Sequence, residues 1–321
     1  TGDVQGDELS HVGRFIPDRF EASIVDSGQV APAPHCTGST TDIAYSGQTL
    51  TWQTPPLFKV TALNENGAIT TNYTIGAFRR LDLAVGDGEI TRTRPAADTD
   101  ELNAANNLYP VDTTQNSLGL EDASAGVITY EFDGSDELTY RKTIDSQIAS
   151  FTPNVEYAIE SVVDADSVSI PSSDLPITFS PQTDFDLLYG RLNLENTFGP
   201  ETRALTMPME IQIWNGARFT RNLDEGCWSY DASADTSLDP AGLTSASGSG
   251  TMMSGEPPLD SEMVLDAPGE GNTGQVEVTF SVPAWLQDDF NGDGSLENPE
   301  ATATFGVFRG HDRIIYWREA E

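Results

Sequence analysis

One segment of the sequence has the residue types and the spacing of a calcium loop. Calcium prefers about six to eight hard oxygen ligands, so side chains at alternate positions of a tight loop suit it. Gly294 stands at position 6, where the chain must turn sharply. The oxygen-bearing side chains occupy positions 1, 3, 5, 7, 9 and 12 of the pattern, in order Asp289, Asn291, Asp293, Ser295, Glu297 and Glu300. The sequence therefore predicts calcium as a cofactor, held by these six residues.

The surroundings of this loop differ from those of an EF-hand. Pro299 stands where the exit helix would begin, and the following ATATFGVF has the pattern of a strand. We therefore expect a calcium loop without flanking helices. A second interpretation stays open, because an acidic surface turn between strands is unremarkable in a chain with 51 Asp and Glu residues.

The two cysteines, Cys36 and Cys227, are far apart and form no CxxC or Cys/His metal-binding motif. When an exported protein has only two cysteines, they usually form a disulfide with each other. A disulfide that closes the long loop between Cys36 and Cys227 would stabilise the fold by about 4 kcal/mol. The sequence leaves both a Cys36–Cys227 disulfide and two separate thiols open.

Catalytic motifs are scarce. The three histidines, His11, His35 and His311, lie in no HExxH, HxH or nucleophile-elbow context. Pairs of carboxylates arise by chance in so acidic a chain, so they do not indicate a glycosidase. We predict that the protein is not an enzyme.

The charge of the chain excludes one class of partner. Against the 51 acidic residues stand 16 basic ones, which gives a formal net charge of −35 at pH 7. Such a polyanion is repelled by nucleic acid, and no basic run offsets the repulsion locally. The chain also has no apolar stretch of the roughly 18 to 20 residues that span a bilayer, so we expect no membrane span.

The elements that must position these residues are strands. Apolar residues alternate with polar ones at 155–163 and 276–282, and 57–63, 127–132 and 209–214 follow the same logic. Turn clusters separate the strands, and amphipathic helices are nearly absent. We predict an all-β fold of two antiparallel, Ig-like β-sandwich domains with long loops, at 1–180 and 181–321. The second domain is expected to contain a long loop at 232–262 and the calcium-type loop at 289–300.

Aromatic residues raise the question of a sugar-binding surface. Trp214 and Trp317 lie within apolar strand patterns, so we expect them in the core. Trp228, next to Cys227, is the better candidate for an exposed ring that could stack on a sugar.

Several segments, in this order, resemble one region of bacterial surface proteins. They are VGRFIPDRF at 12–20, PPLFKVTALNENGAITTNYTIGAF at 55–78, LLYGRLNLENTFGPE at 187–201, IQIWNGARFTRNLDEGC at 211–227 and ATFGVFRGHDRIIYWRE at 303–319. They resemble the conserved C-terminal region of MshQ-type MSHA pilus biogenesis proteins. The resemblance implies an exported domain of unknown biochemical activity, often C-terminal in large proteins linked to type IV pili. It implies no catalytic residues.

Three functional hypotheses follow. The first is a non-catalytic surface module, associated with pilus biogenesis or adhesion, stabilised by calcium and located outside the cell or on the bacterial cell surface. Its partners would be pilus or other cell-surface proteins, or surface glycans. The alternative is a calcium-dependent, lectin-like carbohydrate-binding module. The third is a glycan hydrolase, which needs a cleft with two suitably spaced carboxyl groups. The sequence leaves the receptor, the assembly state and the extent of the full protein open.

Overall fold

The computed structural model describes residues 16–32, 42–81, 88–93 and 111–306. The chain forms two compact units that are not continuous in sequence. Unit 1 comprises Thr1–Ala31, Leu50–Leu138 and Asn154–Thr183, and unit 2 comprises Pro32–Thr49, Thr139–Pro153 and Asp184–Glu321. The predicted division at 180/181 treats each domain as one stretch. The structure instead places two earlier segments, Pro32–Thr49 and Thr139–Pro153, in the unit that holds the C-terminal half.

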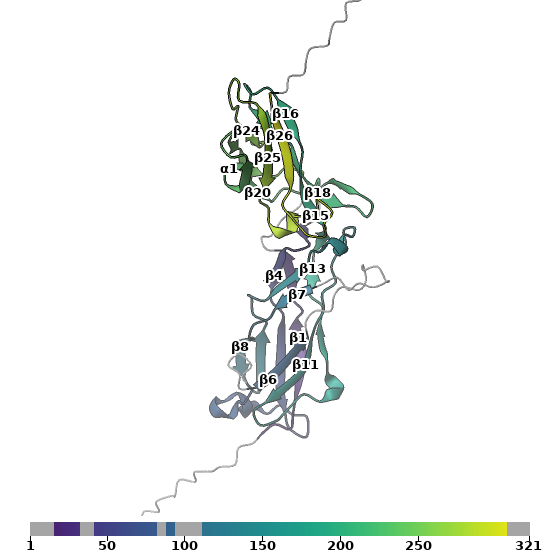
Figure 1. Cartoon of the computed structure of the whole chain (residues 1–321). Coiled ribbons are helices and arrows are strands. Elements are labelled where there is room, and N and C mark those ends of the chain that lie inside the picture. The colour runs from purple at the N-terminus through teal and green to yellow at the C-terminus, as the bar shows by residue number, and fades with distance from the viewer. Residues whose placement is uncertain (1–15, 33–41, 82–87, 94–110, 307–321) are drawn as a thin grey trace, which may run out of the picture. The chain divides into compact units, whose positions relative to one another are not determined.

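Unit 1 is built almost entirely of strands (Figure 1). Its sheets have the orders β1-β5-β9-β8, β13-β2-β4-β10-β7 and β12-β11-β6, and β2, β4 and β10 run past the unit boundary by one or two residues. The elements are β1 (Arg19–Asp26), β2 (Gln29–Pro32), β4 (Thr49–Thr54), β5 (Leu57–Leu63), η1 (Thr71–Thr74), η2 (Gly76–Phe78), β6 (Gly88–Thr93), β7 (Val111–Thr114), β8 (Gly119–Ser124), β9 (Val127–Glu131), β10 (Glu137–Tyr140), β11 (Tyr157–Asp164), η4 (Ser172–Asp174), β12 (Ile177–Phe179) and β13 (Gln182–Thr183).

The core of unit 1 is aromatic. Phe58 of β5 is fully buried, and its ring lies 6.5 Å from Phe132 and 6.0 Å from Phe179, both in edge-on arrangements. Tyr157 of β11 meets Phe132 at 6.0 Å, again edge-on. Edge-to-face aromatic pairs add roughly 0.5 to 1.5 kcal/mol each to the burial of their surface. The alternating apolar residues of these strands therefore fill one shared interior, as their two-residue period requires.

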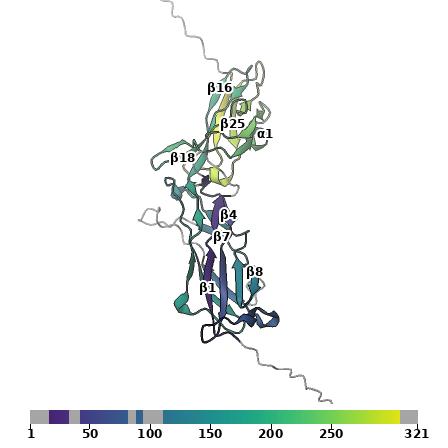
Figure 2. The ribbon, with the colours of Figure 1, turned by 180° about the vertical axis from the view of Figure 1, so that it is seen from behind.

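Unit 2 contains the remaining elements, and β16, β25, α1 and β18 are also seen from behind in Figure 2. Its sheets are β14-β3, β15-β18-β19, β16-β26-β25-β21, β17-β24-β22 and β20-β23. The elements are β3 (Asp42–Tyr45), η3 (Ile144–Ser146), β14 (Phe185–Leu188), β15 (Gly190–Leu194), β16 (Thr197–Gly199), β17 (Leu205–Thr206), β18 (Met209–Trp214), β19 (Phe219–Arg221), β20 (Ser229–Asp231), α1 (Ala232–Asp235), β21 (Thr236–Asp239), β22 (Ala246–Ser247), β23 (Ser249–Thr251), β24 (Val264–Leu265), β25 (Gly274–Phe280), η5 (Ala284–Leu286) and β26 (Glu300–Phe305).

One hydrophobic cluster fills unit 2. Val276, Val278 and Phe280 alternate along β25 and are fully buried, while the intervening Glu277 is exposed. Leu192 of β15 belongs to the same cluster and is also fully buried. The cluster thus joins two sheets, which is the basis of a sandwich.

The all-β prediction is confirmed. The strands expected at 57–63 and 209–214 are β5 and β18, and those expected at 155–163 and 276–282 are β11 and β25, shifted by up to two residues. Most pairings of described strands are antiparallel, but β13 with β2, β14 with β3 and β16 with β26 are parallel. None of the described helices is long and apolar enough to cross a membrane.

The predicted long loop at 232–262 is wrong. This stretch contains the short helix α1 and three strands, of which β21 pairs with β25, β22 with β24 and β23 with β20. Leu238 of β21 packs against the core cluster. The strands are two to four residues long and rich in Ser, Thr and Gly, so tertiary pairing rather than local hydrophobic pattern holds them in place.

Candidate functional site

The predicted calcium loop is closed at its base by backbone pairing in unit 2. Asp288 and Glu297 form an antiparallel bridge, with the amide of Glu297 2.9 Å from the carbonyl of Asp288 and the reverse bond at 3.2 Å. Gly294 has a φ of 91°, a backbone conformation that favours glycine. The bridge and the glycine bend the chain back on itself between η5 and β26.

Three carboxylates converge in this loop. One oxygen each of Asp289, Asp293 and Glu297 lies within 4.8 Å of the others. Backbone amides hold them there: the Asp289 carboxylate accepts from Gly292 at 2.7 Å, from Asp293 at 3.0 Å and from Gly294 at 3.1 Å. Like charges this close repel, and a bound divalent cation would relieve that repulsion.

The other three predicted ligands do not belong to this three-carboxylate group. Asn291 turns its amide nitrogen toward Glu297 (3.0 Å) and Asp293 (3.3 Å), so its side-chain oxygen would have to turn inward to bind a cation. Ser295 donates its backbone amide to Asp293 at 2.9 Å. Glu300 belongs to β26, where its carboxylate accepts from Thr279 at 3.2 Å, and it is not part of the three-carboxylate group.

A buried lysine fixes the segment that leads into the loop. Lys142, only 7% exposed, donates through its Nζ to the carbonyls of Gly190, Trp285 (3.2 Å) and Gln287. The ammonium also lies 4.6 Å from the centre of the Tyr189 ring. Burial lowers the pKa of Lys142 to about 7, while the charge of Asp288 opposes this shift and that of Arg191 adds to it.

Asp288, the residue before the loop, is also buried and paired. Its carboxylate accepts from Arg191 at 2.9 Å and from the Tyr189 hydroxyl at 3.2 Å. The Arg191 guanidinium stacks 3.6 Å from the centre of the Phe219 ring. The segment just before the loop is therefore held by the Asp288–Arg191 ion pair, by aromatic rings and by the carbonyls that bind Lys142.

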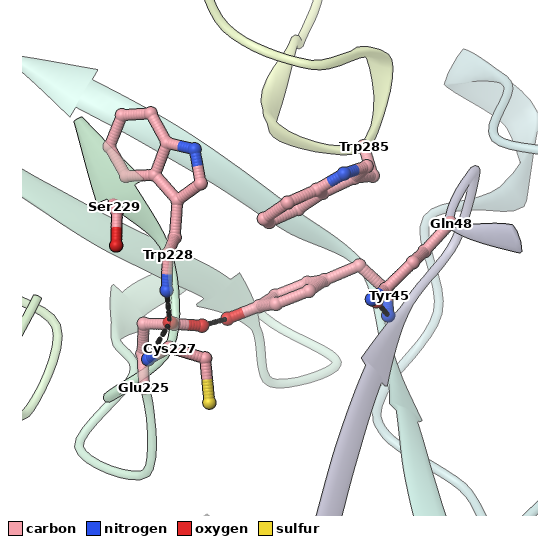
Figure 3. Close-up of a pocket in the computed structure, with 7 residues that line it drawn as sticks. All are labelled: Tyr45, Gln48, Glu225, Cys227, Trp228, Ser229 and Trp285. Carbon is pink, nitrogen blue, oxygen red and sulfur yellow. Dashed lines mark hydrogen bonds between the residues drawn. The ribbon is translucent and has the colours of Figure 1, made fainter. Parts of the chain in front are cut away.

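A second feature of unit 2 is an aromatic pocket, which we define by Tyr45, Glu225, Trp228 and Trp285, with Gln48, Cys227 and Ser229 completing its lining. Its volume is about 230 Å³. Figure 3 shows the two indole rings on either side of the space, with the Tyr45 hydroxyl and the Glu225 carboxylate below them. Tyr45 and Trp285 stack with ring centres 4.9 Å apart and an interplanar angle of 17°.

Glu225 lies at the base of this pocket and is 1% exposed. Its carboxylate accepts from the backbone amides of Cys227 and Trp228, both at 2.8 Å, and from the Tyr45 hydroxyl. The Tyr45 hydroxyl in turn accepts from Asn222 at 2.8 Å. Burial, followed by the negative charge of Glu225, raises the pKa of Tyr45, so the phenol keeps its proton and donates it to the carboxylate.

Sequence reasoning found the acidic loop but missed the pocket and Lys142. Tyr45 and Glu225 are 180 positions apart, so no local motif joins them. A signal for Lys142 was present, because it is one of only two lysines in the chain. Trp228, proposed as an exposed ring, lines the pocket and is half-buried against Tyr230 and Phe280.

Expectations from the sequence also concerned Trp214, Trp317 and the two cysteines. Trp214 is half-buried and contacts Phe219 at 5.3 Å, so it lies at the edge of the core rather than inside it. Cys227 is disulfide-bonded. Cys36 and Trp317 lie outside the described residues, so the Cys36–Cys227 disulfide, one of the two alternatives that the sequence leaves open, is not tested.

Comparison with solved structures finds bacterial adhesins. The adhesin InvE of Yersinia pseudotuberculosis shares 10% sequence identity, with a TM-score of 0.23 over 90% of this chain and 61% of that one. FdeC, an Escherichia coli adhesin, gives 10% identity and a TM-score of 0.25 over 88% of this chain and 65% of its own. The chain thus spans less than two thirds of each, and likeness at this level carries no function across. No curated protein matches the sequence.

Comparison with protein-family models shows the family of the chain. Residues 1–178 match the third domain of DUF6701, and residues 188–320 match its fourth domain. The first match alone covers more than half of the chain. The chain therefore belongs to the DUF6701 family and carries the third and fourth domains of that family.

Proposed function

We propose that the chain is a non-catalytic, exported surface module of bacteria that takes part in adhesion or in the biogenesis of MSHA-like type IV pili. Calcium bound in the loop at 289–297 stabilises it. Its partners are pilus or other cell-surface proteins. It binds them through loops that a rigid β scaffold displays on its surface.

The observation that carries the calcium part of the proposal is the convergence of Asp289, Asp293 and Glu297 within 4.8 Å. Hard carboxylate oxygens are the ligands that calcium prefers, and water completes such a site readily. Glu300 is left out of this ligand set, because its carboxylate lies on β26 beside Thr279. Asn291 or Ser295 would add oxygens after small local turns.

Calcium is expected to raise the melting temperature of the protein. At a calcium concentration about 100 times the dissociation constant, a ligand that binds only the folded state adds about 2.7 kcal/mol. For a unit of this size each kcal/mol corresponds to roughly 2 to 4 °C, so we expect a rise of about 5 to 10 °C over chelator. Differential scanning calorimetry with calcium, magnesium and chelator measures it.

Two matched variants localise this effect. Asp293→Asn removes one charge from the cluster and is expected to abolish most of the calcium-dependent rise. Glu300→Gln removes one charge from an exposed residue outside the cluster and is expected to leave the rise intact. Equal loss in both variants would assign the effect to overall charge instead.

The surface location is supported by two observations on the chain. Cys227 is disulfide-bonded, and disulfides persist in oxidising compartments such as the periplasm and the cell exterior. The segments at 187–201 and 211–227 resemble the C-terminal region of MshQ-type proteins. Antibodies against the chain are expected to label intact bacteria that carry the full-length protein; labelling that requires lysis of the cells would contradict an exported module.

The second candidate function is calcium-dependent carbohydrate binding. The presence of Trp228 and Trp285 in one pocket favours it, because indole faces stack on sugars. Against it, none of the three clustered carboxylates is among the described residues that line the pocket, so calcium and aromatic rings would not hold one sugar together. Glycan-array binding that disappears with chelator would favour this candidate over the scaffold.

A further inference from the structure

The aromatic pocket of unit 2 has the Glu225 carboxylate at its base and two indole rings along its sides. Its volume of about 230 Å³ is below the roughly 300 to 1,000 Å³ of sites for drug-sized ligands, so it suits one small chemical group. The two indoles belong to different segments, since Trp228 precedes β20 and Trp285 lies in η5. Both are held in position: Trp285 stacks on Tyr45, and Trp228 packs against Tyr230 and Phe280.

The negative charge at the base is not neutralised by a neighbouring cation. Within the part of the chain that the structure describes, Glu225 receives three hydrogen bonds, from two backbone amides and from the Tyr45 hydroxyl, and no Lys or Arg forms an ion pair with it. Hydrogen bonds from neutral donors stabilise a carboxylate without cancelling its charge. A buried and unpaired charge in low dielectric attracts a cation more strongly than one on the surface.

The ring faces favour the same sign of charge. Aromatic faces carry negative electrostatic potential, and tryptophan attracts cations most strongly among the aromatic residues. Trp285 stacks one face on Tyr45, so its other face is the one that can meet a cation, and Trp228 turns the nitrogen-bearing edge of its ring toward Trp285 (Figure 3). A cation on the open face of Trp285 would also be attracted by the Glu225 carboxylate below the two indoles.

The number of free hydrogen-bond acceptors in the pocket indicates which kind of cation it suits. A carboxylate has about four acceptor positions, and three on Glu225 are already used. A lysine ammonium brings three donors and an arginine guanidinium five, whereas Glu225 has about one acceptor position left for them. Hexose hydroxyls would meet the same shortage of partners. A quaternary ammonium has no N–H donor and needs only charge and apolar contact.

We propose that the pocket formed by Tyr45, Glu225, Trp228 and Trp285 binds a small quaternary ammonium group. Trp228 and Trp285 contact its alkyl groups, and Glu225 supplies the opposite charge. The group could be carried by a free small molecule or by a choline lipid headgroup, which share this chemistry. The proposal goes beyond the surface-module function and does not depend on calcium.

The test compares choline with 3,3-dimethyl-1-butanol, a neutral molecule of the same shape, in ligand-observed NMR titrations of the intact, disulfide-bonded chain. We expect choline to bind at least about tenfold more tightly than the neutral isostere, because the charge is the main source of attraction. Equal affinity for the two molecules, absence of choline binding, or preferential binding of glucose would overturn the proposal. This comparison needs no variant and so cannot fail through misfolding.

Variants then locate the site. Glu225→Gln keeps the size of the side chain and two acceptor positions but removes the charge, so the preference for choline over the isostere is expected to fall to within about threefold. Trp228→Ala is expected to weaken choline binding at least about tenfold. Trp214→Phe, which changes a tryptophan of the same unit outside the pocket lining, is expected to leave it unchanged. Choline binding that survives both pocket variants would contradict this assignment.

Cosedimentation with vesicles separates the two sources of the ligand. If the headgroup is the source, phosphatidylcholine vesicles pellet the protein and phosphatidylglycerol vesicles do not. If choline binds but neither vesicle pellets the protein, a free small molecule is the source. Pelleting by phosphatidylcholine that Glu225→Gln leaves unchanged would count against the pocket as the binding site.

Discussion

Raising the pH from about 7 to about 9.5 is expected to increase the free energy of unfolding by about 3 kcal/mol through Lys142 alone. An unfolded lysine keeps its proton up to a pKa of about 10.4. In the folded protein, burial lowers the pKa of Lys142 to about 7. Between these two values the unfolded state holds a proton that the folded state has released, so stability rises with pH across this window.

Outside that window the contribution of Lys142 levels off. Below about pH 7 the amine is charged in both states, and its buried charge is a constant cost. Above about pH 10 a trend of opposite sign begins, because the raised pKa of buried Tyr45 means that the unfolded state loses its phenol proton first. The stability maximum is therefore expected on the alkaline side of neutrality.

The chain supplies its own control for this prediction, because it has two lysines. Lys142→Met removes the buried titrating group and should flatten the rise between about pH 7 and 9.5. Lys59→Met removes an exposed lysine on β5 and should leave the rise unchanged. Urea unfolding at a series of pH values gives the free energies. A wild-type curve that stays level over this range, or an equally steep curve for Lys142→Met, would show that Lys142 does not titrate there.

The second large effect is expected at the base of the aromatic pocket. Glu225→Ala should destabilise the protein by about 4 kcal/mol, since it leaves two part-buried amides and a buried tyrosine hydroxyl without their acceptor. Each unsatisfied buried group costs roughly 1 to 3 kcal/mol, and the removed side chain leaves a cavity as well.

Graded substitutions separate these contributions. Tyr45→Phe removes one hydroxyl and should cost about 1 to 2 kcal/mol, because the two amides keep their acceptor. Glu277→Ala removes an exposed carboxylate from β25 in the same unit and should change stability by less than about 0.5 kcal/mol. Denaturant unfolding followed by tryptophan fluorescence reports all three. If Glu225→Ala were no more harmful than Glu277→Ala, the carboxylate would not organise the pocket.

Local pattern was enough to predict the strands with a buried face. In β5, the buried residues Phe58, Val60 and Ala62 alternate with more exposed ones. The same two-residue alternation of apolar and polar residues can be seen in the sequence of this segment. The strands within 232–262 have no such signal, because β22 and β23 are very short and expose polar side chains. They exist through pairing with partners elsewhere in the chain, which a single segment cannot reveal.

The same distinction holds for the sites. The acidic loop is a local motif, so spacing alone grouped Asp289, Asp293 and Glu297. Spacing also included Glu300, which lies on β26 and outside the three-carboxylate group. The pocket depends on Tyr45 meeting Glu225 and Trp285 across most of the chain. Contiguous domains were likewise the simplest expectation, whereas Pro32–Thr49 and Thr139–Pro153 join unit 2 through tertiary contacts.

The most direct test of the proposed function is a crystal structure of the chain grown with saturating calcium, with the ion identified by its anomalous signal. We expect one ion at about 2.3 to 2.6 Å from carboxylate oxygens of Asp289, Asp293 and Glu297, with Asn291 turned to present its oxygen. A loop that keeps its internal hydrogen bonds and holds no ion under these conditions would contradict the proposal.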